Sequence, residues 1–181
     1  MKNLKIGLLP LYIKLYDDSW PELRAGVDAF YQTIASELQK RELEVVTSPV
    51  CRVKAEFESA VGFFETEKVD AIVTLHLAYS PSLESADVLA RTKLPLIVLD
   101  TTPVYDFSPS QNPDEILYNH GIHGVQDMCS LLLRNGKSFM IEAGHWEKSD
   151  VLDRIKDCVK AVKIAENIKK ARVGKLGGSF K

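Results

Sequence analysis

The stretch DAIVTLHLAYSPSLESADVLARTKLPLIVLD, residues 70–100, contains two apolar runs separated by a short amphipathic segment. Residues 71–75 and 95–99 are almost wholly apolar, as parallel strands covered on both faces are. Between them, Ser80 stands at a helix N-cap position and Pro81 at the first helical position. The stretch therefore predicts a strand, a helix and a second strand, which together form a βαβ unit.

The same alternation continues on both sides of this unit. Further strands are predicted at residues 5–9, 43–47 and 138–141, and further helices at residues 20–41, 53–68, 122–134 and from Ser149 onward. A capping box of Ser19 and Glu22 is expected to start the first helix, and Asn135 with Gly136 to end the helix before the last strand. Five βα units predict an α/β protein with a three-layer, doubly wound parallel sheet, flavodoxin-like or Rossmann-like.

The length of 181 residues suits one domain, and residues 1–170 are predicted to form a single α/β domain. Residues 171–176 resemble a sixth strand with no element after it. We therefore expect residues 171–181 to begin a following domain of a longer, truncated polypeptide, the alternative being a polar tail. Residues 100–118 form a long loop with little periodicity, which favours a functional role over a merely connecting one.

Composition excludes several partners and locations. The 23 basic and 25 acidic residues give a net charge of -2, which offers no electrostatic attraction to nucleic acid or to an anionic membrane. No apolar run is long enough to span a membrane, and the N-terminus does not resemble a signal peptide, so a cytoplasmic protein is expected. The three cysteines are widely spaced, which predicts buried reduced thiols.

All four histidines come after predicted strands. They are His76, His120, His123 and His145. Because ligands of open α/β sheets bind beyond the carboxyl ends of the strands, these positions predict a binding site at that edge. The alternative is that loops are polar and contain histidines for no functional reason.

The residues at this edge do not support several kinds of chemistry. The first βα turn, PLYIKLY at residues 10–16, lacks the glycines that a dinucleotide pyrophosphate requires. A phosphate-accepting receiver domain would have an aspartate where this chain has His76. A zinc site built from the histidines would need a metal-binding spacing, and the sequence has none.

Aromatic residues gather at the same edge, and the combination favours a sugar as ligand. The stretch NHGIHGVQD, residues 119–127, has two glycines that permit a tight backbone near a helix N-terminus, and the free N–H groups there favour an oxygen-rich or anionic ligand. Aromatic rings stack on sugar C–H faces, while histidine and glutamine side chains exchange hydrogen bonds with hydroxyls. The aromatic residues are Tyr12, Tyr16, Tyr79, Tyr105, Phe107 and Trp146. The alternative is that several of them pack beneath the long loop.

The chain resembles the N-terminal domain of the L-arabinose/L-fucose isomerase family. The segments that carry the resemblance are the aromatic-rich first turn, LAYSP at residues 77–81, residues 119–127 and EAGHW at residues 142–146. Members of that family are cytoplasmic, manganese-dependent aldose–ketose isomerases with three domains, assembled as trimers or larger oligomers. The resemblance implies that the metal ligands come from later domains. It also implies that Tyr79 and His123 help to close a neighbouring subunit's active site, with His120 lining the same pocket.

The predicted function is that of the N-terminal, substrate-closing domain of an L-fucose/L-arabinose-like isomerase, not catalytic in isolation. The expected sugar-binding residues are His123, His120, Tyr79, Tyr12 and Gln126. No cofactor is expected on this chain, and Mn²⁺ or a similar divalent metal is expected in a full-length homo-oligomer, a trimer or hexamer. The first turn lacks the glycine–serine–glutamine pattern of arabinose isomerases, so the identity of the sugar stays open.

Two other functions fit the same residues. The chain could be a stand-alone sugar- or metabolite-binding regulatory module of flavodoxin-like fold. It could also be a small enzyme in which His123 is the general base and Glu142 or Asp100 supplies an acid.

Overall fold

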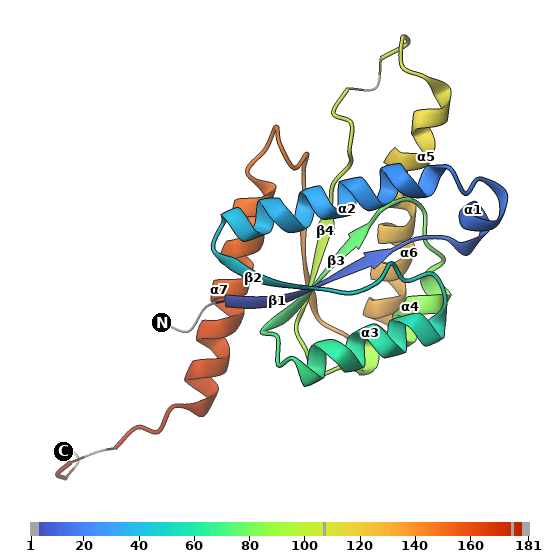
Figure 1. Ribbon diagram of the computed structural model, residues 1–181. Helices are drawn as coiled ribbons and strands as arrows, with labels where there is room; N and C mark the ends of the chain where they lie inside the picture. Colours follow the sequence, from blue (N-terminus) through green and yellow to red (C-terminus); the bar gives the residue numbers. More distant parts are fainter. Residues whose placement is uncertain (1–3, 107, 175, 179–181) are drawn as a thin grey trace.

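Five parallel strands form one sheet with helices on both faces (Figure 1). The computed structural model describes residues 4–106, 108–174 and 176–178, so Phe107 lies outside the described residues. The strands are β1 Leu4–Leu11, β2 Leu43–Thr47, β3 Ala71–His76, β4 Leu96–Asp100 and β5 Phe139–Ala143. The helices are α1 Lys14–Ser19, α2 Leu23–Lys40, α3 Lys54–Thr66, α4 Ser82–Arg91, α5 Ile116–Asn119, α6 Gly121–Arg134 and α7 Val151–Lys170, with a 3₁₀ helix η1 at Pro113–Glu115. The strand order β2-β1-β3-β4-β5 confirms the predicted doubly wound α/β fold and is the flavodoxin-like order.

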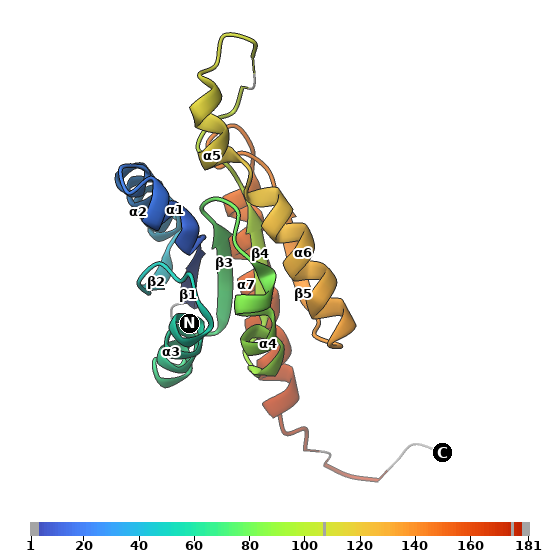
Figure 2. The ribbon, with the colours of Figure 1, turned by 90° about the vertical axis from the view of Figure 1, so that its right-hand side faces the viewer.

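Two apolar cores lie on the two faces of the sheet. Helices α2 and α7 cover one face, and α3, α4 and α6 cover the other (Figure 2). Successive side chains of a strand point to opposite faces, so Ile6 and Leu8 of β1 join the first core while Leu9 and Leu11 join the second. Because both faces are covered, the central strands read as unbroken apolar runs in the sequence.

Strand β1 is longer than predicted and continues through Pro10. A proline cannot donate a ladder hydrogen bond. The pairing between β1 and β2 ends at Leu8 and Thr47, before Pro10 is reached. No residue of β2 therefore needs a hydrogen bond from the N–H group that Pro10 lacks. Beyond that point, Cys51 pairs with this edge of β1, and its N–H donates to the Pro10 carbonyl at 3.0 Å.

The first predicted helix, residues 20–41, is found as α2, and a short helix that was not predicted, α1, precedes it. Helix α1 ends at Ser19, and α2 begins at Leu23 with Glu22 at its N-cap and no side-chain hydrogen bond there. The predicted capping box of Ser19 and Glu22 is therefore wrong, because Ser19 is the last residue of the preceding helix. The Trp20 amide instead donates to the Tyr16 carbonyl at 2.8 Å and closes α1.

The predicted sixth strand is not found in the described part of residues 171–178. After α7 ends at Lys170, residues 171–174 continue without regular structure and Val173 is 95% exposed. A strand exists only where a neighbouring strand supplies its ladder hydrogen bonds, and no described strand lies beside this segment. The apolar pattern of residues 171–176 alone was therefore not sufficient to predict a strand.

The predicted end of α6 is confirmed. Gly136 has φ of 69°, the left-handed conformation that the Asn135–Gly136 pair predicts. The long loop after β4 is also confirmed, although it ends in η1 and α5, and it projects from the carboxyl edge of the sheet (Figure 1). Within the described ranges, no helix combines the length and apolarity needed to cross a membrane.

Candidate functional site

The order of the strands reverses between β1 and β3: β2 lies on one side of β1, and β3 and the later strands lie on the other. In this class of fold, ligands bind in the crevice beyond the carboxyl ends of the two strands at such a switch point. Polar side chains from three elements gather there: α1 after β1, the turn after β3, and the start of α6. We call this surface the histidine strip. It consists of Tyr16, Tyr79, His120, His123, Gln126 and Asp127, all partly or fully exposed.

His120 joins α1 to the α5–α6 junction. Its Nδ1 lies 2.8 Å from the Ile116 carbonyl, and because a carbonyl only accepts, Nδ1 carries the proton. The Nε2 atom is then an acceptor for the Tyr16 hydroxyl, 3.0 Å away. Burial lowers the pKa of His120. His120 is therefore a neutral imidazole at neutral pH, with both ring nitrogens already bonded.

His123 and Tyr79 lie farther along the strip. The His123 ring is 6.5 Å from the His120 ring, between ring centroids, and its side chain is exposed on the first turn of α6. Tyr79 hydroxyl reaches Asp127 Oδ2 at 3.5 Å, a long hydrogen bond. Asp127 is one helical turn beyond His123, and Gln126 is three residues beyond it, so they share one side of α6.

The structure thus brings together four of the five predicted sugar-binding residues: His120, His123, Tyr79 and Gln126. The fifth, Tyr12, lies beneath the strip. It is 1% exposed, its ring is 6.0 Å from that of Tyr16, and the Arg24 guanidinium lies 5.7 Å above it. Burial raises the pKa of Tyr12 to about 12. Sequence reasoning did not single out Asp127, although its helical spacing from His123 is a usable signal.

His76 does not join the strip, although it ends β3. It is 4% exposed, and neither ring nitrogen has a hydrogen-bond partner among the described protein atoms. Burial lowers its pKa to about 3, so the ring is neutral. The two glycines of α6 explain its position. A Cβ on Gly121 would lie 3.0 Å from the His76 carbonyl oxygen, and one on Gly124 would lie 2.7 Å from His76 Cδ2.

The sequence predicted that these glycines permit a tight backbone near the helix N-terminus. In the structure they permit close approach of α6 to the end of β3. This contact places the first turn of α6, and with it His123, at the crevice.

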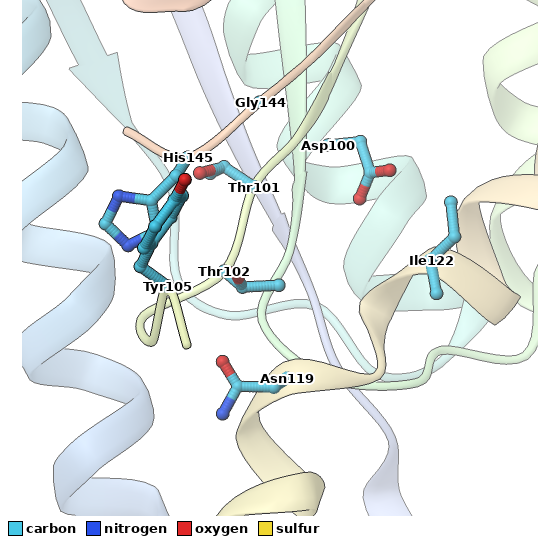
Figure 3. Close-up of a pocket in the computed structure, with 8 residues that line it drawn as sticks. All are labelled: Asp100, Thr101, Thr102, Tyr105, Asn119, Ile122, Gly144 and His145. Carbon is cyan, nitrogen blue, oxygen red and sulfur yellow. The ribbon is translucent and has the colours of Figure 1, made fainter. Parts of the chain in front are cut away.

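A separate cavity of about 310 Å³ lies beyond the carboxyl ends of β4 and β5 (Figure 3). Its polar lining consists of Asp100, Thr101, Thr102, Tyr105, Asn119 and His145. In Figure 3, Asp100 lies on one side of the cavity and the Tyr105 and His145 rings on the other. None of the five predicted sugar-binding residues lines it. Asp100 ends β4 and was named from the sequence as a candidate acid, while Thr101 and Thr102, which directly follow the strand, were not singled out although the carboxyl-edge rule points to them.

His145 is held rigidly at this cavity. Its Nδ1 accepts hydrogen bonds from the Glu147 and Lys148 amides, both at 3.2 Å, so Nε2 carries the proton and faces the Pro103 carbonyl at 3.4 Å. The ring also meets the Tyr105 ring edge-on, with centroids 5.4 Å apart. The four histidines therefore occupy three environments rather than one site.

Asp100 is the only carboxylate in the lining. Burial raises the pKa of its side chain. No ion pair to it is present among the described residues, and its own carbonyl accepts from the Gly144 amide at 3.0 Å. The carboxylate is thus a free hydrogen-bond acceptor at the cavity wall.

Comparison with known proteins does not assign the chain to a family. No protein-family model matches it, and no curated protein matches it. Among solved structures, it is similar to a periplasmic sugar-binding protein of an ABC sugar transporter from Legionella pneumophila. The TM-score is 0.30 and the identity 14%, over 88% of this chain and 67% of that chain. The chain is therefore defined by its own strand order and site, as a flavodoxin-like α/β domain with polar residues gathered at the carboxyl edge.

Proposed function

We propose that this chain is the N-terminal, substrate-closing domain of an aldose–ketose isomerase similar to the L-fucose and L-arabinose isomerases, and that it is not catalytic alone. One observation carries the proposal: the histidine strip lies at the switch point of the sheet, and each of its side chains is partly or fully exposed. A ligand bound there would be covered on one side only. A second surface is needed to enclose it, as in a domain that closes over a substrate held elsewhere.

The chemistry of the strip suits a sugar. His123 and Gln126 offer both donors and acceptors to hydroxyls, and Asp127 offers an acceptor. The ring of Tyr79 offers an apolar face for sugar C–H groups. The neutral His120 adds no charge that would favour an anionic substrate over a neutral one.

In the proposed enzyme, the metal would be held by residues of later domains. A divalent ion would polarise the sugar carbonyl and hydroxyl. The described residues contain no group of three or more His, Cys, Asp or Glu side chains that could hold an ion, so they do not fit it. The role of this chain is then to bind and enclose the sugar.

The proposal extends to the assembly. The facing surface would come from another subunit of a cytoplasmic homo-oligomer, a trimer or hexamer, and the ligand would be a small neutral sugar. The strip combines exposed side chains from one helix and two turns, which could contact a neighbouring active site.

Replacement of His123 by glutamine tests the proposal in the product of the natural gene, supplied with Mn²⁺ and a panel of aldopentoses and 6-deoxyaldohexoses. We expect isomerisation by that product and a fall in kcat/KM of about tenfold to a hundredfold in His123→Gln, because a substrate hydrogen bond is lost. Arg134→Gln, an exposed change at the other end of α6, is the matched control and should leave kcat/KM unchanged. The 181-residue chain alone should show no turnover.

Three results would each overturn the proposal. They are isomerisation by the 181-residue chain alone, no isomerisation of any tested aldose by the natural gene product, and an unchanged kcat/KM in His123→Gln.

A further inference from the structure

The cavity between β4 and β5 is separate from the histidine strip. The two meet at the α5–α6 junction, where Asn119 and Ile122 line the cavity while His120 and His123 belong to the strip. The cavity is formed entirely by this chain, from the ends of two strands, the loop after β4 and the start of α6 (Figure 3).

The charge of the lining excludes an anionic ligand. Asp100 is the one carboxylate, and the lining contains no lysine or arginine. A phosphate or carboxylate would meet a like charge in a partly buried setting, where Coulomb repulsion is weakly screened. The ligand is therefore neutral or cationic.

The hydrogen-bonding groups favour a neutral ligand. Thr101 Oγ1 already accepts from the Trp146 amide at 2.9 Å, so its hydroxyl hydrogen is available to donate. Thr102 donates to the Val104 carbonyl at 2.8 Å, so its oxygen is available to accept, as is the carboxylate of Asp100. An ammonium group only donates, whereas a hydroxyl both donates and accepts. A mixed set of donors and acceptors matches several hydroxyls.

The aromatic side of the cavity completes this pattern. Tyr105 is 68% exposed and is held edge-on against the His145 ring, which has its own fixed hydrogen bonds. Its free face offers a surface for C–H groups, and its hydroxyl is a further donor and acceptor. The volume of about 310 Å³ is at the lower end of ligand cavities.

We propose that this cavity is a second binding site on the chain, specific for a small neutral polyol, with Asp100 as the main acceptor for its hydroxyls. The site is independent of the substrate-closing role of the histidine strip. Its ligand class is the open-chain polyol or monosaccharide, recognised by adjacent hydroxyls on one side and C–H groups on the other.

The test is a titration of the 181-residue chain with xylitol, followed by the backbone amide signals in two-dimensional NMR. Xylitol carries five hydroxyls and no carbonyl, so no isomerase can convert it and binding is separated from turnover. We expect saturable shifts at Thr101, Thr102, Gly144 and His145. In Asp100→Asn, which keeps the shape and removes the charge, the affinity should fall about tenfold or more, because a hydrogen bond to a charged group is lost.

Asp114→Asn is the matched control. It makes the same chemical change at an exposed aspartate in η1 that does not line the cavity, and should bind xylitol as the wild type does. The amide spectrum of Asp100→Asn away from the cavity shows whether the variant is folded. If it is not, Thr102→Val provides the second variant, with an expected loss of affinity of severalfold.

The proposal is overturned if xylitol produces no saturable shift up to its solubility limit, or if its shifts fall on the histidine strip instead. Tighter binding of ethylammonium than of xylitol would overturn the assignment of a neutral ligand. Loss of isomerase activity in the natural gene product has no bearing on these signals, so failure of one proposal is distinguishable from failure of the other.

Discussion

Gly7→Ala is expected to destabilise the fold by about 1–3 kcal/mol, because the added methyl group overpacks a close-packed core. Gly7 lies in β1, paired with β2 on one side and β3 on the other. A Cβ there would lie 2.5 Å from Cγ and 2.7 Å from both Cδ atoms of Phe64, a fully buried ring of α3. Since both strand neighbours fix β1, the ring must move. The measurement is the free energy of unfolding from urea denaturation monitored by circular dichroism.

Gly62→Ala is the matched control. Gly62 lies in α3, two residues before Phe64, and a Cβ there would meet no atom within 4 Å. The same substitution should therefore stabilise the protein, by up to about 1 kcal/mol, because alanine is the better helix former. Equal effects of the two substitutions would contradict the packing argument.

A compensating change tests the contact itself. Phe64→Ala removes Cγ and both Cδ atoms, which are the atoms that the new methyl group would meet. The double variant Gly7→Ala/Phe64→Ala is expected to be more stable than the sum of the two single changes predicts, by about 1 kcal/mol or more, since the effects of contacting residues are not additive. If the changes in the free energy of unfolding were strictly additive, the Phe64 ring would not be the reason that position 7 requires glycine.

The strands were predictable because both faces of the sheet are covered. Burial on two faces makes a strand a short, nearly continuous apolar run, and β2 was located at Leu43–Thr47 as predicted. Pro10 was the exception. Local chemistry argues against a proline in a central strand, and only the long-range pairing with Cys51 shows why this one is accepted.

The capping box at Ser19 and the sixth strand were predicted wrongly because each depends on neighbouring structure that the local sequence pattern does not show. Ser19 has the right spacing from Glu22 for a capping box, but α1 uses Ser19 as its own last residue. Residues 171–174 have an apolar alternation, but no described strand lies beside them to pair with.

For the candidate site, topology was predictable and side-chain environment was not. A parallel sheet brings all carboxyl ends to one edge, so His120, His123 and Tyr79 could be placed together. That His76 is buried depends on Gly121 and Gly124, which lie 45 and more residues away in the sequence and determine how closely α6 approaches β3. Burial of this kind follows from tertiary packing, and no spacing rule predicts it.

Acidification is expected to destabilise the protein through His76. Its pKa falls from 6.5 to about 3 on burial in the folded state. Between these two values the unfolded chain takes up a proton at His76 and the folded chain does not. The unfolded state then binds more protons, so the free energy of unfolding falls as the pH falls through this window. The stabilisation is fully present above the unfolded pKa and is lost progressively below it.

The variant His76→Leu isolates this contribution. Relative to it, the wild type should lose about 3 kcal/mol of stability between about pH 7.5 and about pH 4.5, because carboxylates affect both proteins alike and only the wild type has the titrating ring. Urea denaturation at the two pH values gives this difference.

Thr74→Val is the control, because it removes another fully buried and unpartnered polar atom of β3 that does not titrate. Its effect on stability should be the same at both pH values. If the difference in free energy of unfolding between the wild type and His76→Leu is also independent of pH, then His76 takes up a proton as readily in the folded protein as in the unfolded chain. In that case α6 must move away from the His76 ring at acidic pH. The first turn of α6, which carries His123, would then be less rigid than the close contacts of Gly121 and Gly124 with His76 indicate.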